Sequence, residues 1–271
     1  RCRLINKTTK LIYAGLVPRI ITWAEKNSYT VENRVPSLVT EWTEFDTQKL
    51  IDTHPVPMEV RDYQREAITW AMHNQRCVLL SPTASGKSLI LYYLVRARLS
   101  VAPVLLIVPT ISLVSQMVED WRGYGWANVD RYVHRISAGA DKDTTKPVVV
   151  STWQSIFKQP EEWFTQFQSV IGDEAHGYKA ESLRGIMEKL PHCSFRVGAT
   201  GTLDETKSHK MVVEGVFGKA HRVARTAELQ TKGHLTPIRV QAHLLQYPKY
   251  DTWFIAKHKR KYTYDIDYIV Q

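Results

Sequence analysis

The sequence predicts an α/β protein built on a doubly wound parallel sheet, and two observations lead to that prediction. Short apolar runs, typical of buried strands, alternate with segments whose apolar residues recur at helical spacing. A Gly-Lys-Ser turn at residues 86–88 lies between one predicted strand and one predicted helix. This is the place where such folds bring backbone N–H groups toward an anion.

The composition is that of an ordinary globular domain. The 271 residues are 44% hydrophobic and 23% charged, and the longest apolar run, residues 101–109, falls well short of the roughly 20 residues of a membrane span. A membrane protein is therefore not expected. Three widely spaced cysteines indicate a reducing compartment, so a cytoplasmic location is expected. The net charge of +9 suits a polyanionic partner such as nucleic acid.

The elements follow in order from Val60. Val60, Tyr63 and Ala67 begin a helical pattern that runs to residue 72. Beyond it, apolar runs of three to five residues predict strands, and amphipathic stretches predict helices. The predicted strands are residues 77–80, 104–108, 148–150, 169–171 and 195–199, and the further helices are residues 89–99, 112–121 and 181–190.

Two composition changes suggest the domain limits. Residues 52–57 read DTHPVP, and two prolines in six residues are typical of a linker. We expect residues 1–57 to form a small N-terminal α/β module that could bind DNA, and residues 58–250 to form the main domain. Residues 251–271 are expected to lead into a missing second domain, so the chain is expected to be truncated at both ends.

The turn after the first strand has the residues of a phosphate loop. Its sequence is SPTASGKS, from Ser81 to Ser88. Gly86 would let the backbone approach a phosphate, Lys87 would reach the β- and γ-phosphates, and Ser88 would ligate Mg²⁺. The loop residues expected to hold the cofactor are Ser81, Thr83, Ala84, Ser85, Gly86, Lys87 and Ser88. Ser81 stands where the strict pattern has glycine.

An acidic pair follows a later strand. Asp173-Glu174-Ala175-His176 comes directly after an apolar run. Asp173 would hold Mg²⁺, because this cation prefers carboxylate oxygens, and Glu174 would deprotonate an attacking water. In a doubly wound sheet this strand end and the phosphate loop lie on the same carboxyl edge, so the two motifs predict one site.

These motifs, in this order, resemble those of the superfamily 2 helicases. SPTASGKS, Asp-Glu-Ala-His and VGATGTL at residues 197–203 are similar to motifs I, II and III, although Gly201 stands where alanine is more common. The resemblance implies a RecA-like fold, ATP and Mg²⁺ as cofactors, and catalytic roles for Lys87, Asp173, Glu174 and His176. It further implies nucleotide binding by Arg61 and Gln64, nucleic-acid contacts by Pro109, Thr110, Gln116 and Thr152, and coupling through Thr200, Gly201 and Thr202.

The resemblance implies an ATP-dependent DNA helicase, monomeric, that acts on single-stranded or branched DNA in recombination, repair and fork remodelling. No segment with a glutamine and closely spaced arginines follows Leu203, so this chain is expected to bind ATP but to hydrolyse it poorly. Two alternatives remain open. The chain could be the motor of a restriction-type DNA translocase, or a non-catalytic nucleic-acid clamp with a vestigial ATP site.

Overall fold

The computed structural model describes residues 11–32, 34, 38–101, 103–137, 139–203 and 207–236, without the side chains of Lys179 and Lys207. The chain divides into two units at Leu235, and the elements below belong to the first. The segment expected to lead into a second domain, residues 251–271, lies outside the described residues.

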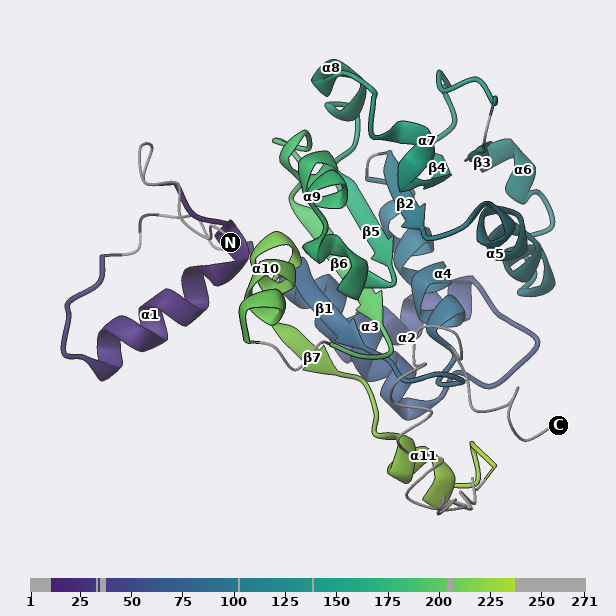
Figure 1. Cartoon of the computed structure of the whole chain (residues 1–271). Coiled ribbons are helices and arrows are strands. Elements are labelled where there is room, and N and C mark those ends of the chain that lie inside the picture. The colour runs from purple at the N-terminus through teal and green to yellow at the C-terminus, as the bar shows by residue number, and fades with distance from the viewer. Residues whose placement is uncertain are drawn as a thin grey trace, which may run out of the picture. The chain divides into compact units, whose positions relative to one another are not determined.

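A parallel β-sheet forms the centre of this unit (Figure 1). Seven strands of the described chain pair in the order β3-β4-β2-β5-β6-β1-β7, and every pairing is parallel. Every residue of β2, β4 and β5 is buried, as expected for a sheet that helices cover on both faces. The strands are β1 Arg76–Leu80, β2 Val104–Val108, β3 Val133–Ile136, β4 Val148–Thr152, β5 Ser169–Asp173, β6 Phe195–Thr200 and β7 Ala220–Arg222.

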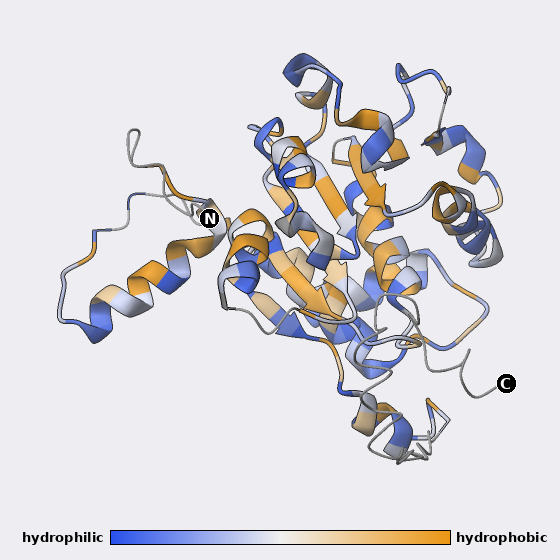
Figure 2. Cartoon of the chain, viewed as in Figure 1, coloured by the Kyte–Doolittle hydropathy of each residue, from blue (hydrophilic) through white to orange (hydrophobic). Residues whose placement is uncertain are grey.

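Two apolar clusters cover the two faces of the sheet. Alternate residues of β2 belong to different clusters: Leu106 packs with α3, α4 and α5, whereas Leu105 packs with η2, α9 and α10. Figure 2 shows the apolar residues concentrated on the strands and on the helices against them. The helices are η1 Ala14–Leu16, α1 Val17–Lys26, α2 Glu44–Thr53, α3 Asp62–Asn74, α4 Lys87–Arg98, α5 Ile111–Gly123, α6 Val129–Tyr132, α7 Trp153–Ile156, α8 Glu161–Phe164, η2 Ala175–Lys179, α9 Glu181–Glu188, α10 Lys207–Phe217 and α11 Thr226–Thr231.

The predicted doubly wound sheet is confirmed. The strand β2 has the predicted bounds, and β1, β4, β5 and β6 are one or two residues longer than their apolar runs. The sequence analysis missed β3 and β7, which carry His-Arg in place of a continuous apolar run. Both are edge strands of the sheet. An edge strand is covered less completely than a central one, so its sequence can stay polar.

The described residues before residue 57 lie in the same compact unit as the sheet. The helix α2 packs against α3, where Ile51 is buried in the core and Thr47 Oγ1 lies 2.7 Å from Thr69 Oγ1. The two prolines of the predicted linker, Pro55 and Pro57, lie between α2 and α3 and only separate two helices of one unit. Among the described residues, no helix combines the length and apolarity needed to cross a bilayer.

Two glycines allow a tight contact between the sheet and the segment that follows β5. Gly172 in β5 is directly opposite Gly198 in β6. The rings of Tyr178 and Phe217 pack edge to face, 4.8 Å apart, over this pair. A Cβ at Gly172 would lie 2.7 Å from Tyr178 Oη and 2.8 Å from Phe217 Cζ, so the close packing requires glycine there.

We therefore expect Gly172→Ala to lower the free energy of unfolding by about 1–3 kcal/mol, because two buried rings must shift. Urea unfolding followed by circular dichroism measures this change. Gly185→Ala is the matched control, since no atom outside its own helix backbone lies within 4 Å of its added Cβ and alanine favours its helix. Equal stability of the two variants would contradict the packing argument.

Candidate nucleotide and nucleic-acid sites

The loop between β1 and α4 has the backbone of a phosphate loop. Ala84 and Gly86 have φ values of 62° and 78°, in the left-handed region. Gly86 is also the N-cap of α4, and a Cβ there would lie 2.2 Å from Gln64 Nε2. Glycine at this position therefore satisfies both the left-handed turn and the close approach of α3.

Residues of α3 and its N-cap support this loop from outside the cavity. Gln64 Nε2 and Tyr63 Oη donate hydrogen bonds to the Ser85 carbonyl, at 2.8 and 3.1 Å. The backbone N–H of Arg61 donates to Gln64 Oε1 (2.9 Å), and its guanidinium donates to Tyr63 Oη (2.9 Å). Neither Arg61 nor Gln64 lines the cavity described below, so in this structure both act on the loop. Their predicted contact with a nucleotide base stays a prediction.

Serine hydroxyls close the loop internally. Ser81 Oγ lies 2.6 Å from Ser85 Oγ, which also donates to the Pro82 carbonyl at 2.6 Å. Both serine residues are buried. The serine at the position where the strict motif has glycine thus stabilises the loop through its hydroxyl.

The loop lysine pairs with both predicted carboxylates. Lys87 Nζ lies 2.7 Å from Asp173 Oδ1 and 2.5 Å from Glu174 Oε1. Burial alone would lower the pKa of Lys87, but the charges and hydrogen bonds of the two carboxylates outweigh it and hold this pKa above its ordinary value. Lys87 is therefore charged at neutral pH.

A second cluster joins the acidic pair to the end of β6. His176 Nδ1 lies 2.9 Å from Thr200 Oγ1 and 3.2 Å from Glu174 Oε2, and Thr200 Oγ1 donates to the Thr202 carbonyl at 2.9 Å. Glu174 itself has a left-handed φ of 49°, which is uncommon for a residue with a side chain. The structure thus brings together the residues predicted for catalysis and those predicted for coupling.

One cavity of about 480 Å³ lies beside the loop, the acidic pair and the end of β6. The predicted residues that line it are Ser81, Thr83, Ala84, Gly86, Lys87, Ser88, Asp173, Glu174, Gly201 and Thr202. One face of α5 forms another wall, with Leu113, Gln116, Met117 and Asp120. The sequence analysis missed Leu113, Met117 and Asp120, and it predicted Gln116 for nucleic-acid contact instead. The sequence signal for this wall is that its residues follow Leu113 by three, four and seven positions, which places them on one helical face, and that two of them are polar.

The oxygen donors at this cavity fit a magnesium nucleotide. Mg²⁺ prefers hydroxyl, carboxylate and phosphate oxygens and is bound by one or two protein groups together with substrate phosphates. Ser88 and Asp173 supply such groups, and Lys87 supplies positive charge for phosphate. No group of three or more His, Cys, Asp or Glu side chains gathers into a metal site within the described part of the chain.

Tyr124, the C-cap of α5, contacts a residue that lines this cavity. Its hydroxyl lies 2.8 Å from Ser88 Oγ. Burial raises the pKa of Tyr124, and burial also raises the pKa of Asp120 above its ordinary value. The phenol therefore keeps its proton at neutral pH.

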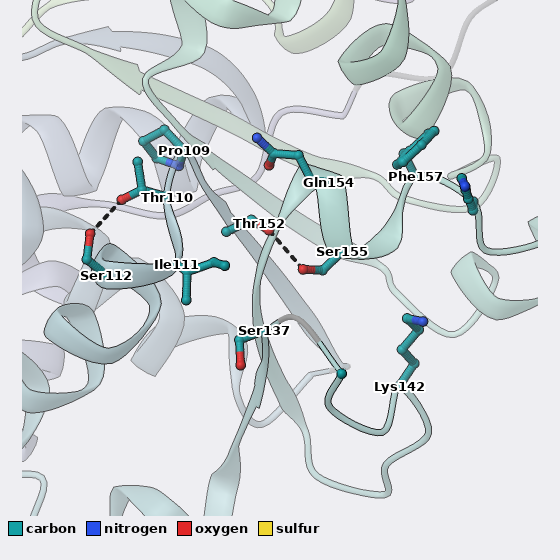
Figure 3. A pocket seen from close by; sticks show the side chains of 12 residues that line it. Pro109, Thr110, Ile111, Ser112, Ser137, Lys142, Thr152, Gln154, Ser155 and Phe157 are labelled. Atoms are coloured by element: carbon teal, nitrogen blue, oxygen red, sulfur yellow. Dashed lines mark hydrogen bonds between the residues drawn. The ribbon is translucent and has the colours of Figure 1, made fainter.

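A second cavity, of about 810 Å³, lies at the carboxyl ends of β2 and β4 (Figure 3). The predicted residues Pro109, Thr110 and Thr152 line it. Figure 3 shows Thr110 and Ser112 on one side of the hollow and Ser155 and Lys142 on the other. Four lining residues lie near the predicted ones in sequence: Ile111, Ser112, Gln154 and Ser155. The lining residues that sequence reasoning missed are Ser137, Gly139, Lys142, Phe157 and Lys158.

Gln116 is placed apart from the other residues predicted for nucleic-acid contact. It lies on the α5 face toward the nucleotide cavity, one and a half turns beyond Thr110. Thr110 caps the same helix, and its hydroxyl accepts a hydrogen bond from the Leu113 N–H at 3.4 Å. The helix α5 therefore reaches both cavities.

Known proteins resemble this chain in sequence and in fold. The family described as "Type III restriction enzyme, res subunit" matches residues 57–205, more than half of the chain. The "ATP-dependent DNA helicase uvsW" of Enterobacteria phage T4 is 36% identical over 192 residues, or 69% of this chain and 38% of that protein. The "DNA 3'-5' translocase XPB2" of Sulfurisphaera tokodaii is 30% identical over 162 residues, or 57% of this chain and 34% of that protein.

Solved structures show the same similarity. The crystal structure of the UvsW helicase from bacteriophage T4 matches with a TM-score of 0.75 and 31% identity over 82% of each chain. The helicase domain of Pyrococcus furiosus Hef matches with a TM-score of 0.55 and 19% identity, over 66% of this chain and 41% of that one, which shows a shared fold.

The chain spans 38% and 34% of the length of the two curated relatives. The match to the family covers the phosphate loop, the acidic pair and the end of β6, which surround the nucleotide cavity. The chain belongs to the family described as Type III restriction enzyme, res subunit, and is a homologue of the UvsW helicase of bacteriophage T4.

Proposed function

We propose that this chain binds Mg-ATP and forms the first motor domain of an ATP-dependent DNA helicase or translocase. One observation carries the proposal: Lys87, Ser88, Asp173 and Glu174 come from two separate strand ends and line one cavity. These are the residue types that phosphoryl transfer needs. The names of the two curated relatives, a DNA helicase and a DNA translocase, support the proposed class of reaction.

Each residue has a role that follows from its chemistry. Lys87 places a positive charge beside the phosphates, and Ser88 and Asp173 would hold Mg²⁺. The bound cation would neutralise charge on the phosphate oxygens. Glu174 accepts the proton of the attacking water, and its Oε1 is held by Lys87 at 2.5 Å until substrate enters.

The contact between His176 and Thr200 supports a route from hydrolysis to movement. Glu174 Oε2 lies 3.2 Å from His176 Nδ1, which lies 2.9 Å from Thr200 Oγ1. A change in charge or position at Glu174 therefore reaches Thr200 through two contacts, and Thr200 donates to the Thr202 carbonyl. We propose the segment of Thr200, Gly201 and Thr202 as the coupling element.

The cavity at the ends of β2 and β4 is proposed to hold a DNA strand. Its rim carries hydroxyls on both sides and the two lysines Lys142 and Lys158, groups that contact phosphates without reading sequence. We further propose branched DNA as the substrate, in recombination, repair and fork remodelling. The 36% identity to a DNA helicase supports DNA as the partner, and the branched form is carried over from the resemblance of the motifs.

Lys87→Ala should weaken the binding of Mg-ATP by about 10- to 100-fold, because the variant loses a charged donor to the phosphates. Isothermal titration calorimetry with a non-hydrolysed ATP analogue measures this loss. Lys49→Ala, at an exposed lysine of α2 outside the cavity, is the control and should bind as the wild type does. Undiminished binding by Lys87→Ala would refute the proposed nucleotide site.

Replacing both Lys142 and Lys158 by alanine should weaken the binding of single-stranded DNA and flatten its salt dependence. Each lost phosphate contact reduces the slope of log K against log salt by about 0.7, so the double variant should lose about 1.4. Fluorescence anisotropy at several salt concentrations gives the slope. Alanine at Lys49 and Lys232, two exposed lysines that line neither cavity, controls for net charge. An unchanged slope in the first variant would place the strand elsewhere.

Branched DNA should bind more tightly than linear duplex if the proposed substrate is right. A forked duplex and a linear duplex of equal length and composition, compared by competition against one labelled strand, test this preference. Both DNA forms carry the same number of phosphates, so a difference in their affinities cannot come from general charge attraction. Equal competition by the two would leave the motor proposal intact and reject the branched substrate.

A further inference from the structure

The two polar side chains that open α4 both have protein partners in this structure. Lys87 contacts Asp173 and Glu174, whereas the hydroxyl of Ser88 lies 2.8 Å from the hydroxyl of Tyr124. Tyr124 lies outside every motif of the sequence analysis. Its contact nevertheless falls on the residue proposed above to ligate Mg²⁺.

The position of Tyr124 is fixed by its surroundings. It ends α5, where its N–H donates to the Asp120 carbonyl at 2.9 Å, and Gly125 then turns the chain with a φ of 98°. The ring packs edge to face on Tyr92, with centroids 5.5 Å apart and planes at 71°. Tyr92 lies one helical turn after Ser88 on α4, so the same face of α4 meets the ring and the hydroxyl of Tyr124.

The packing of the Tyr124 ring does not account for its hydroxyl. A phenylalanine ring would pack against Tyr92 equally well, and the hydrogen bond of the Tyr124 hydroxyl goes to Ser88. Mg²⁺ requires near-ideal octahedral geometry, so the Ser88 oxygen must orient toward it in order to ligate. The Ser88 oxygen has two lone pairs, and a phenol that donates to one of them leaves the cation a single direction of approach.

We propose that Tyr124 is a positioning residue of the nucleotide site, which holds the Ser88 hydroxyl when the site is empty and competes with the cation for it. The inference rests on the proposed nucleotide-binding function and deepens it. Lys87 offers a parallel, because its ion pairs with Asp173 and Glu174 must likewise be exchanged when phosphate enters. The binding of Mg-nucleotide then replaces the internal contacts of both Lys87 and Ser88.

Tyr124→Phe in the 271-residue chain tests this inference. Calorimetric titration with ADP is carried out once with Mg²⁺ and once with EDTA, and the ratio of the two affinities is compared with that of the wild type. We expect the ratio to rise about fivefold, the factor that corresponds to one ordinary hydrogen bond. The affinity in EDTA should stay unchanged, because no cation is then present for Ser88 to ligate. A merely structural change would instead alter both affinities together.

Two further variants make the result specific. Tyr93→Phe removes the hydroxyl of a neighbouring tyrosine of α4, whose bond goes to the His54 carbonyl at 3.1 Å, and should keep the wild-type ratio. Ser88→Ala removes the proposed ligand. In that background Tyr124→Phe should have no further effect on the ratio, because the two residues act through one contact.

The outcomes separate the inference from the function beneath it. A wild-type chain that binds no Mg-nucleotide overturns both. A wild-type chain that binds it, together with a Tyr124→Phe ratio equal to or below the wild-type value, overturns only the role of Tyr124. A gain that persists in the Ser88→Ala background also overturns it, because the effect would then not pass through Ser88.

Discussion

The acidic end of β5 depends on two opposed glycines. Because Gly172 lacks a side chain, Tyr178 can pack directly on the sheet, and Gly198 leaves room for Ala175 and Phe217 in the same way. The chain therefore turns back immediately after Asp173, with Glu174 in a left-handed conformation at the turn. This reversal aims the Glu174 carboxylate at Lys87 on one side and at His176 and Thr200 on the other. The charged site is thus held in place by apolar packing beneath it.

The parallel sheet then gathers segments that are far apart in sequence. The phosphate loop follows β1, Thr110 follows β2, and Thr152, Asp173 and Thr200 end β4, β5 and β6. Since all strands run the same way, these five ends share one edge. Strand order separates them into two groups: β5, β6 and β1 are consecutive and surround the nucleotide cavity, whereas β2 and β4 carry the second cavity.

Features that depend on a local sequence pattern, such as strands and loop motifs, could be predicted from the sequence. Contacts that depend on packing between distant segments were predicted less well. Buried strands such as β2 are recognised in the sequence as apolar runs. The phosphate loop at Gly86 and the acidic pair at Asp173 directly follow such runs. The role of Gln64 as a support for the Ser85 carbonyl arises from the approach of α3, which no local pattern encodes. Tyr124 was missed for the same reason, because its partner Ser88 lies 36 residues away.

The helix α5 has a thermodynamic consequence for the proposed motor. Thr110 at its beginning lines one cavity, Gln116 and Asp120 along its face line the other, and Tyr124 at its end contacts Ser88. If a DNA strand at the first cavity shifts this helix, the affinity for nucleotide changes by some factor. Linkage then requires nucleotide to change the affinity for the strand by the same factor. Through this one helix, the binding of either ligand would change the affinity for the other.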